Sequence, residues 1–233
     1  MKFFIVSISL ILCLVTCTFA ENLNAPNPNE NFFKDYYLKG LNFAIAGNFE
    51  QAQLELSKGM SPNHLMMMVL NDARNGKLKK EVAINIFIGY KHAYENNWEQ
   101  MIVSFNNAVK EAQSYIHAYL IRANMLYDIE SFDLAIADFT KVIQLDQNNL
   151  QAYLGRGSSY GGQGNYDLAI SDYNKAVEIN PNFGEAYKNR AVAYFGKKDY
   201  DKAWTDVHKA ELLGYKVPAD FLDELKKASG RQN

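Results

Sequence analysis

The fold is decided by residues 150–183, which read LQAYLGRGSSYGGQGNYDLAISDYNKAVEINPNF. This stretch aligns without gaps to residues 116–149 and to residues 184–217, so the chain repeats with a 34-residue period. Chance alone would give fewer than about one column that is identical in all three copies. The observed identical columns are Ala118, Ala152, Ala186; Tyr119, Tyr153, Tyr187; Arg122, Arg156, Arg190; Asp133, Asp167, Asp201; Ala135, Ala169, Ala203; Asp138, Asp172, Asp206; and Lys141, Lys175, Lys209.

Each period is predicted to form two helices joined by a tight turn. Apolar residues recur at intervals of three and four within each half, as on one face of a helix, and do not alternate as in a strand. Ser131, Asn165 and Asp199 each precede an aromatic residue at the start of the second half. Their side chains are of the types that accept hydrogen bonds from the free N–H groups of a helix start, so we expect N-caps here.

The same cap pattern continues upstream of the three clear copies. Asn97 lies one period before Ser131, and Asn48 lies 49 residues before Asn97. Small and aromatic residues around both positions keep the repeat spacing. The sequence therefore predicts degenerate repeats at residues 31–60 and 80–115.

The longer interval between the two degenerate repeats predicts an extra helix at residues 61–76. Ser61 would cap it, Pro62 would take the first helical position, and Gly76 would end it. The helix contains three consecutive methionines, Met66 to Met68. They are expected to fill the core under the neighbouring hairpins, with an adaptable partner surface as the alternative.

The first twenty residues have the composition of a secretory signal peptide cleaved after Ala20. Lys2 is followed by an apolar run that ends at Cys17, and the polar residues 21–30 form a linker. Cys13 and Cys17 are the only cysteines, so a cleaved chain has no thiol and no disulfide. A retained membrane anchor and a lipoprotein modified at Cys17 stay open as alternatives. The expected location is periplasmic or extracellular, with no stable membrane span after cleavage.

The repeats resemble the tetratricopeptide repeat family. The likeness covers residues 116–217 strongly and residues 33–60 and 84–112 in degenerate form. It is carried by Ala152-Tyr153, Gly157, Tyr160, Gly164-Asn165-Tyr166, Ala169-Ile170, Tyr173, Lys175-Ala176 and Asn180-Pro181. The resemblance implies an all-α, right-handed superhelical solenoid of antiparallel helix hairpins. About five hairpins are expected, plus the extra helix and a C-terminal cap helix with its tail at residues 218–233.

The resemblance also implies that the first helix of each hairpin lines a concave groove that binds another protein or peptide. Leu120 and Leu154 stand where a clamp for a C-terminal carboxylate would need a cation, so an extended segment or a partner helix is the expected ligand. The groove residues expected to contact this partner are Tyr37, Tyr90, Tyr94, His117, Leu120, Asn124, Tyr127, Gln151, Leu154, Ser158, Glu185, Lys188 and Phe195.

Two further patterns each allow a structural and a functional interpretation. The glycines at positions 155, 157, 161, 162 and 164 indicate close helix packing and a turn, or else an open stretch of groove. The arginine column and the second aspartate column indicate a ladder of partly buried ion pairs, or else a ligand site. The structural interpretation is favoured for both, and the ladder comprises Arg122, Arg156, Arg190, Asp138, Asp172 and Asp206.

Composition and motifs exclude several functional classes. The chain has 24 Lys and Arg against 26 Asp and Glu, so it has no positive excess for nucleic acid. None of its four histidines has the spacing of a zinc-protease motif, and no phosphate-binding loop is present. We therefore expect a non-enzymatic scaffold without cofactor or metal. A self-associating module, an auxiliary lipoprotein, and an enzyme that uses Arg122, Asp138 or His117 remain as alternatives.

Overall fold

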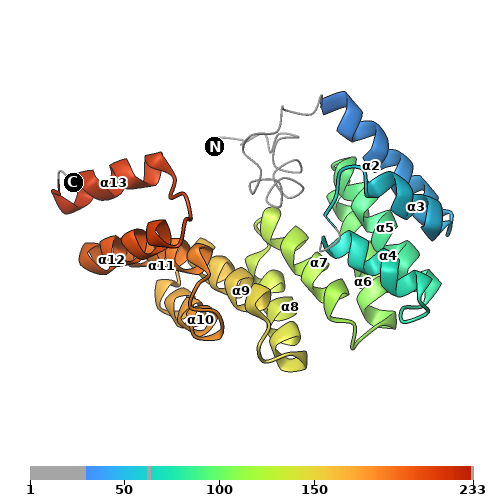
Figure 1. Cartoon of the computed structure of the whole chain (residues 1–233). Coiled ribbons are helices and arrows are strands. Elements are labelled where there is room, and N and C mark those ends of the chain that lie inside the picture. The colour runs from blue at the N-terminus through green and yellow to red at the C-terminus, as the bar shows by residue number, and fades with distance from the viewer. Residues whose placement is uncertain (1–29, 62–63, 232–233) are drawn as a thin grey trace. The chain divides into compact units, whose positions relative to one another are not determined.

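The computed structural model describes residues 30–61 and 64–231, and these residues form twelve helices and no strand. The predicted leader and linker lie outside the described residues, apart from Glu30. The predicted all-α architecture of about five helix hairpins, an extra helix and a cap helix is confirmed (Figure 1). The hairpins are α2–α3 (Glu30–Ile45, Phe49–Leu56), α5–α6 (Lys80–Tyr94, Trp98–Glu111), α7–α8 (Ile116–Asp128, Phe132–Leu145), α9–α10 (Leu150–Gly162, Tyr166–Ile179) and α11–α12 (Gly184–Gly196, Tyr200–Leu212). The other two helices are α4 (Leu65–Arg74) and α13 (Ala219–Ser229).

The chain divides into two compact units. Unit 1 ends at Ala118 and contains α2 to α6 with the first residues of α7. Unit 2 begins at Tyr119 and contains the rest of α7 with α8 to α13. Within unit 2, each helix from α8 to α13 packs against the next one along the chain, as expected for stacked hairpins.

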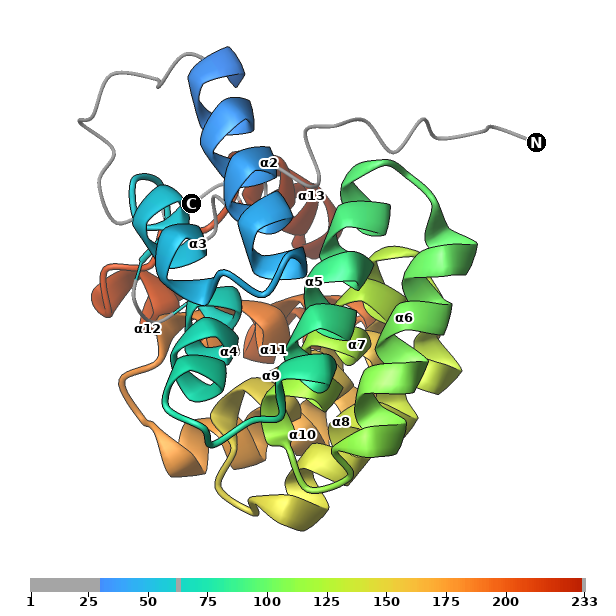
Figure 2. The ribbon, with the colours of Figure 1, turned by 90° about the vertical axis from the view of Figure 1, so that its right-hand side faces the viewer.

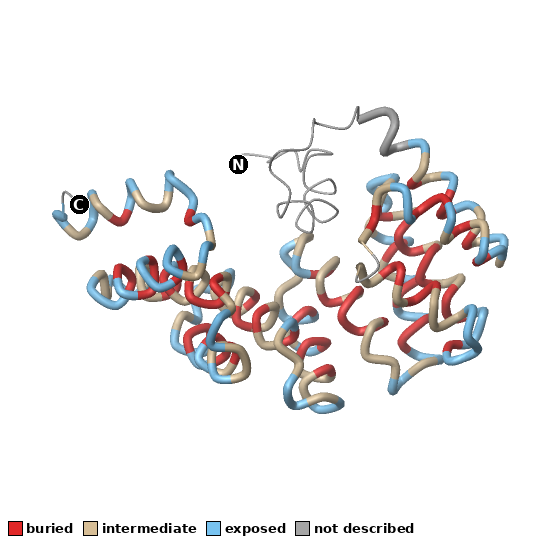
Figure 3. The backbone as a smooth tube through the Cα atoms, in the orientation of Figure 1, coloured by how far each residue is buried: buried red, intermediate tan, exposed pale blue. Residues whose placement is uncertain are grey.

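Small residues at repeating positions form the centre of unit 2. Ala135, Ala169 and Ala203 each have 0% of their surface exposed, and they lie on the second helices of successive hairpins. Around Ala169 lie Leu154, Ile170, Tyr173 and other buried side chains of one hydrophobic cluster. In Figure 3 buried and exposed residues alternate along α8, α10 and α12, whereas α9 and α11 carry few exposed residues. The repeated alanines allow helices to approach closely, because larger side chains there would separate them.

Three of the five clustered glycines are packed against aromatic rings. A Cβ atom at Gly157 would lie 2.7 Å from Cε1 of Tyr173, and one at Gly162 would lie 2.6 Å from Cζ of Phe132. A Cβ atom at Gly155 would collide with the ring of Phe139. These contacts support the structural interpretation of the cluster at these three positions. Gly161 differs, because nothing lies within 4 Å of its added Cβ atom.

The turn inside every hairpin places one residue in the left-handed backbone region, directly before the N-cap. The residues are Gly47 (φ 76°), Asn96 (57°), Glu130 (60°), Gly164 (76°) and Lys198 (62°). Glycine adopts this conformation without steric cost, whereas other residues are strained in it. The same backbone turn is therefore built in all five hairpins, at a cost in the three that lack glycine.

Gly161 and Gly164 provide a test of this turn, since neither has a neighbour that an added methyl group would meet. Gly164→Ala should lower the free energy of unfolding by about 1–2 kcal/mol, because alanine is strained at positive φ. Gly161→Ala should raise it by about 0.4–1 kcal/mol, because a helical glycine gives the unfolded chain excess freedom. Urea unfolding of residues 21–233 would measure both changes. Changes of the same sign would contradict this interpretation.

All three residues predicted as caps occupy the N-cap position, but only Asp199 makes the capping hydrogen bond. Asp199 accepts a hydrogen bond from the backbone N–H of Lys202, and upstream Asn48 and Asn97 make the same kind of bond. Ser131 and Asn165 occupy the N-cap position but make no capping bond. The side-chain amide of Asn165 instead donates to Gln163.

This difference predicts unequal effects of cap removal. Asn97→Ala should cost about 1 kcal/mol of stability, because Asn97 Oδ1 accepts the N–H of Gln100 at 3.3 Å. Ser131→Ala should cost less than ~0.5 kcal/mol, because no capping bond is lost there. Thermal unfolding of the two variants side by side would measure the difference, and equal losses would speak against it.

The extra helix α4 begins later than the sequence predicts. It starts at Leu65 with His64 as its N-cap, and the Nδ1 atom of His64 accepts the N–H of Met66 at 3.2 Å. Ser61 is therefore not its cap, because the imidazole three residues beyond Ser61 supplies the capping acceptor. The predicted first residue, Pro62, lies outside the described residues. Met66 and Met67 are 0% and 3% exposed, so they fill the core and do not form a partner surface.

The last helix, α13, covers the end of unit 2. Leu225 is 0% exposed, and Phe221 packs edge-on against Phe195 with ring centroids 5.6 Å apart. The indole N–H of Trp204 donates to the hydroxyl of Ser229 at 3.1 Å. The helix thus closes the apolar end of the stack. Across the described residues, no helix combines the length and the apolar character needed to cross a membrane.

Candidate functional site

The arginine and aspartate columns meet as three ion pairs of the same geometry. Each arginine donates from Nε and Nη2 to the two carboxylate oxygens of the aspartate sixteen residues later, at 2.5–2.8 Å. The aspartate side chains are 5–7% exposed and the arginine side chains 16–18%. The hydrogen bonds to Asp172 and Asp206 raise the pKa values of Arg156 and Arg190. Each pair joins the two helices of one hairpin.

Two of these arginines also reach the preceding hairpin. Arg156 donates from Nη1 to the hydroxyl of Thr140 at 3.1 Å, and Arg190 donates from Nη1 to Asn174 at 2.6 Å. Each guanidinium also lies over the tyrosine three residues before it, 5.8 Å from the ring centroid at Tyr153 and 5.3 Å at Tyr187. The guanidinium groups are thus held on several sides by the fold, which leaves them little freedom to bind a ligand.

The aspartate column of Asp133, Asp167 and Asp201 makes polar contacts to later parts of the chain that the sequence did not predict. Asp133 accepts from the amide of Gln163 at 2.7 Å, Asp167 pairs with Lys197, and Asp201 pairs with Arg231 at 2.6 Å. Each partner lies 30 residues later, at the end of the next hairpin's first helix or in the C-terminal tail. The recurrence of polar residues at this interval could have indicated these links. They are exposed, so each contributes little energy.

The open part of the predicted groove lies on the first helices of unit 2. We use the name groove face for the repeat positions represented on α9 by Gln151, Leu154, Ser158 and Gly161. The same positions on α11 are Glu185, Lys188, Val192 and Phe195, and on the unit 2 part of α7 they are Leu120, Asn124 and Tyr127. Gln151 is exposed, and Tyr127 and Val192 are 38% and 43% exposed. Tyr127 and Phe195 therefore occupy the position that is empty at Gly161, on the hairpins before and after it.

Several predicted groove residues are buried in the core and cannot contact a partner in this structure. Tyr37 and Tyr90 in unit 1 are 5% and 6% exposed, and Leu120 and Leu154 in unit 2 are 3% and 8% exposed. Their side chains are large and apolar, and they pack between neighbouring helices. The other predicted residues are exposed or half-buried.

Polar groups gather beside the groove face of α9. The hydroxyls of Ser158 and Tyr173 lie 3.1 Å apart, so one donates to the other. Burial raises the pKa of Tyr173 well above its usual range, and the nearby Tyr127 and Glu185 raise it further. Tyr173 therefore stays neutral. The face combines aromatic rings with hydroxyl and carboxylate groups, which suits the main chain and side chains of a peptide and provides no nucleophile activated by a base.

Comparison with known proteins identifies the repeats. Three models of the tetratricopeptide repeat match the chain, at residues 116–149, 150–183 and 172–205. Residues 116–205 match the tetratricopeptide repeat in sequence. Two of the matches coincide with the periods read from the sequence, and the third follows the same repeats in a shifted register. No curated protein matches the chain.

Solved structures show the same tetratricopeptide repeat fold. MamA of AMB-1 is 18% identical, with a TM-score of 0.55 over 77% of this chain and 97% of that chain. MamA of MSR-1 is also 18% identical, with a TM-score of 0.54 over 78% of this chain and 96% of that chain. A further MamA structure is 23% identical, with a TM-score of 0.54 over 75% and 94%. At these identities the likeness concerns the fold alone.

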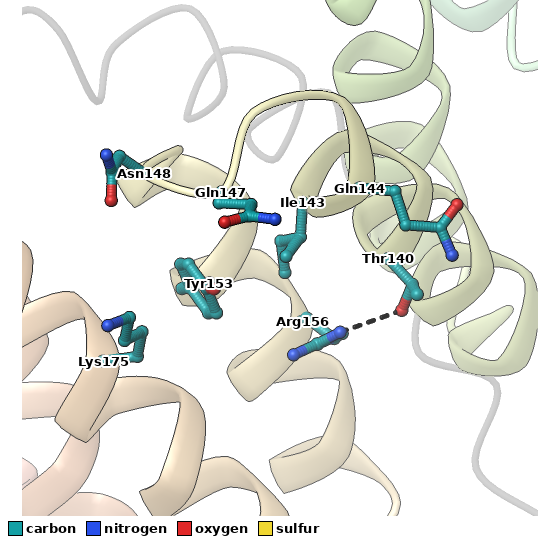
Figure 4. Close-up of a pocket in the computed structure, with 8 residues that line it drawn as sticks. All are labelled: Thr140, Ile143, Gln144, Gln147, Asn148, Tyr153, Arg156 and Lys175. Atoms are coloured by element: carbon teal, nitrogen blue, oxygen red, sulfur yellow. Dashed lines mark hydrogen bonds between the residues drawn. The ribbon is translucent and has the colours of Figure 1, made fainter.

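The tetratricopeptide repeats also carry a pocket of about 460 Å³ away from the groove face. Figure 4 shows the side chains of α8, the α8–α9 connection, α9 and α10 that surround it. They are Thr140, Ile143, Gln144, Gln147, Asn148, Tyr153, Arg156 and Lys175. Arg156 is already bound to Thr140 and Asp172, and three of the other lining side chains, Gln144, Gln147 and Asn148, are neutral amides. No predicted partner-binding residue lines this pocket.

His117 lies in unit 1, at the start of α7 and of the first match to the tetratricopeptide repeat. Its Nδ1 atom is 3.8 Å from Oδ2 of Asp72, which also accepts a hydrogen bond from the Tyr115 hydroxyl at 2.8 Å. Burial lowers the pKa of His117, and Asp72 opposes this shift. No group of three or more His, Cys, Asp or Glu side chains that could hold a metal ion occurs among residues 30–61 and 64–231.

Proposed function

We propose that this protein is a non-enzymatic scaffold that binds a peptide segment or a helix of a partner protein on the groove face of unit 2. The tetratricopeptide repeats support a role in protein interaction. The observation that carries the proposal is the openness of this face: Tyr127 and Val192 are exposed, and the space at Gly161 is empty. Aromatic side chains such as Tyr127 are enriched among the anchor residues of protein interfaces.

Gly161 provides a sharp test, because a side chain added there begins in open space on the groove face. Nothing lies within 4 Å of its Cβ position. Gly161→Trp in residues 21–233 should abolish capture of the partner from the native extract, while the chain unfolds at the same urea concentration as wild type or higher. Ser171→Trp, at an exposed position of α10, is the matched control and should capture the partner as wild type does. Equal capture by both variants, or no partner above background with wild type, would refute the proposal.

We also propose that the scaffold acts after export, in the periplasm or outside the cell. The support is the sequence of residues 1–20, with its single lysine and apolar run before Ala20. Mass spectrometry of the protein from the exported fraction should find a chain that begins at Glu21. A chain that still begins at Met1, or one that carries lipid on Cys17, would be evidence against cleavage at this site.

A further inference from the structure

Polar side chains from neighbouring helices of unit 2 meet beside the groove face. Ser158 lies on α9, Tyr173 on α10 and Glu185 on α11, and these helices pack against one another (Figure 2). The hydroxyls of Ser158 and Tyr173 are 3.1 Å apart. Glu185 is near enough to Tyr173 to raise its pKa, and the next residue, Ala186, belongs to the same buried cluster as Tyr173. Tyr127 of α7 also raises this pKa, so three hydroxyls and one carboxylate gather here.

The carboxylate of Glu185 has no counter-ion among the residues that the structure describes. Glu185 is half-buried, yet none of these residues donates a hydrogen bond to its carboxylate or forms an ion pair with it. Lys188 is the other charged residue of the groove face, and its Nζ atom lies over the ring of Tyr215, 6.0 Å from the centroid. The buried Asp172, by contrast, receives two hydrogen bonds from Arg156. A cation brought by a partner would therefore meet a carboxylate that the fold leaves unpaired.

The helix that carries Glu185 does not require this charge. Glu185 lies in the first turn of α11, where a carboxylate interacts favourably with the helix dipole. The repeat places Gln151 at the same position of α9, and α9 has no acidic residue in its first turn. Both helices nevertheless have 13 residues. The charge therefore distinguishes the groove face at α11 from the same position one repeat earlier, and helix formation does not account for the difference.

Apolar contact area borders this polar group of side chains. Tyr127 and Val192 are 38% and 43% exposed, and nothing lies within 4 Å of a Cβ atom added at Gly161. Gly161 follows Ser158 by three positions on α9, and residues three apart on a helix are neighbours on its surface. The open space and the polar group therefore adjoin. A segment with a basic and a large apolar residue a few positions apart would match both.

We propose that the groove face of unit 2 binds a partner segment that carries a lysine or arginine close to a large apolar residue. The basic side chain pairs with Glu185 and donates further hydrogen bonds to the hydroxyls gathered beside it. The apolar side chain enters the space at Gly161 and contacts the exposed ring of Tyr127. The inference rests on the proposed function of this face and names the chemistry of its partner.

Selection from a display library of random dodecapeptides, with residues 21–233 as the target, tests this partner chemistry. The enriched peptides should carry Lys or Arg within a few positions of Leu, Met or an aromatic residue. Gly161→Trp should retain none of them, because its side chain occupies the open space. A labelled synthetic peptide of the enriched consensus should bind Glu185→Gln about tenfold more weakly than wild type, since the basic side chain loses its charged partner. Urea unfolding would confirm that both variants stay folded.

Glu178→Gln is the matched control, because it removes a carboxylate that is 69% exposed on α10, and it should bind the consensus peptide as wild type does. The same peptide with its basic residue changed to glutamine should bind wild type and Glu185→Gln equally. A consensus without a basic residue, or equal binding of the consensus peptide to wild type and Glu185→Gln, would overturn the inference and leave the proposed function standing. If no peptide bound wild type more tightly than Gly161→Trp, both the inference and the proposed function would fall.

Discussion

Asp172→Ala should lower the free energy of unfolding by about 3–5 kcal/mol. This is the largest loss that we expect from a single substitution in unit 2. Asp172 is 5% exposed and receives two hydrogen bonds of 2.8 Å from Arg156. Its removal leaves the guanidinium partly buried without its counter-ion. Because Arg156 also binds Thr140, the loss would loosen α8, α9 and α10 together. Urea unfolding of residues 21–233 would measure the change.

Two further variants separate the buried pair from ordinary charge loss. Arg156→Met combined with Asp172→Leu removes both charges and should restore most of the lost stability, since an apolar pair of similar volume avoids the cost of desolvation. Asp167→Ala removes an aspartate that is 82% exposed in its pair with Lys197, and should change stability by less than ~0.5 kcal/mol. If Asp172→Ala were as mild as Asp167→Ala, the pair would have no structural role.

Asp128→Asn should stabilise the protein at pH 8 and leave its stability nearly unchanged at pH 4. Burial raises the pKa of Asp128 from 3.8 to about 7, and its Oδ2 atom has no hydrogen-bond partner in the described structure. The folded chain thus binds this proton more tightly than the unfolded chain. The stability from Asp128 is fully present below pH 3.8 and is lost as the pH rises to about 7. The full loss corresponds to at most ~4 kcal/mol.

The difference between wild type and Asp128→Asn isolates this group from others that titrate in the same range. Burial lowers the pKa values of His64 and His117, so those residues favour the folded state as the pH rises through their unfolded values. Their contribution is the same in both proteins and cancels. Chemical unfolding at intervals between pH 4 and pH 8 would give the difference curve. A curve that stays flat across this range would show that Asp128 titrates normally.

The periodic part of the sequence predicted the helices because each repeat position has one physical role. Ala169 is buried at 0% exposure, and Arg156 meets Asp172, as recurrence across three hairpins implies. The buried carboxylate of Asp128 was not predicted by this reasoning. The corresponding residues in the next two repeats are Gly162 and Gly196, which carry no charge to bury. A departure from the repeat therefore marked the one carboxylate of the described residues that has an unsatisfied buried oxygen. Sequence comparison within the chain could have detected it.

The candidate site was less predictable than the fold. The spacing of Leu154 places it at a groove position, yet its side chain packs between helices. Spacing alone does not distinguish a side chain buried between helices from one exposed on the groove face. The packing of α4 was also hidden, because its apolar pattern does not say which helices it contacts. In the structure α4 packs against α3 and α5.

The contacts between neighbouring hairpins join residues 16 or 30 positions apart in every repeat, and this regularity makes one repeat interchangeable with the next. If residues 150–183 were excised, Arg190 would take the place of Arg156 opposite Thr140, and Lys197 would take the place of Gln163 opposite Asp133. Each substituted contact remains chemically sound, because an arginine still meets a hydroxyl and a polar donor still meets a carboxylate. The chain can therefore gain or lose a repeat by in-frame duplication or deletion without the cost of an unpaired charge. The length of its groove face is in this sense a variable that gene rearrangement alone can adjust.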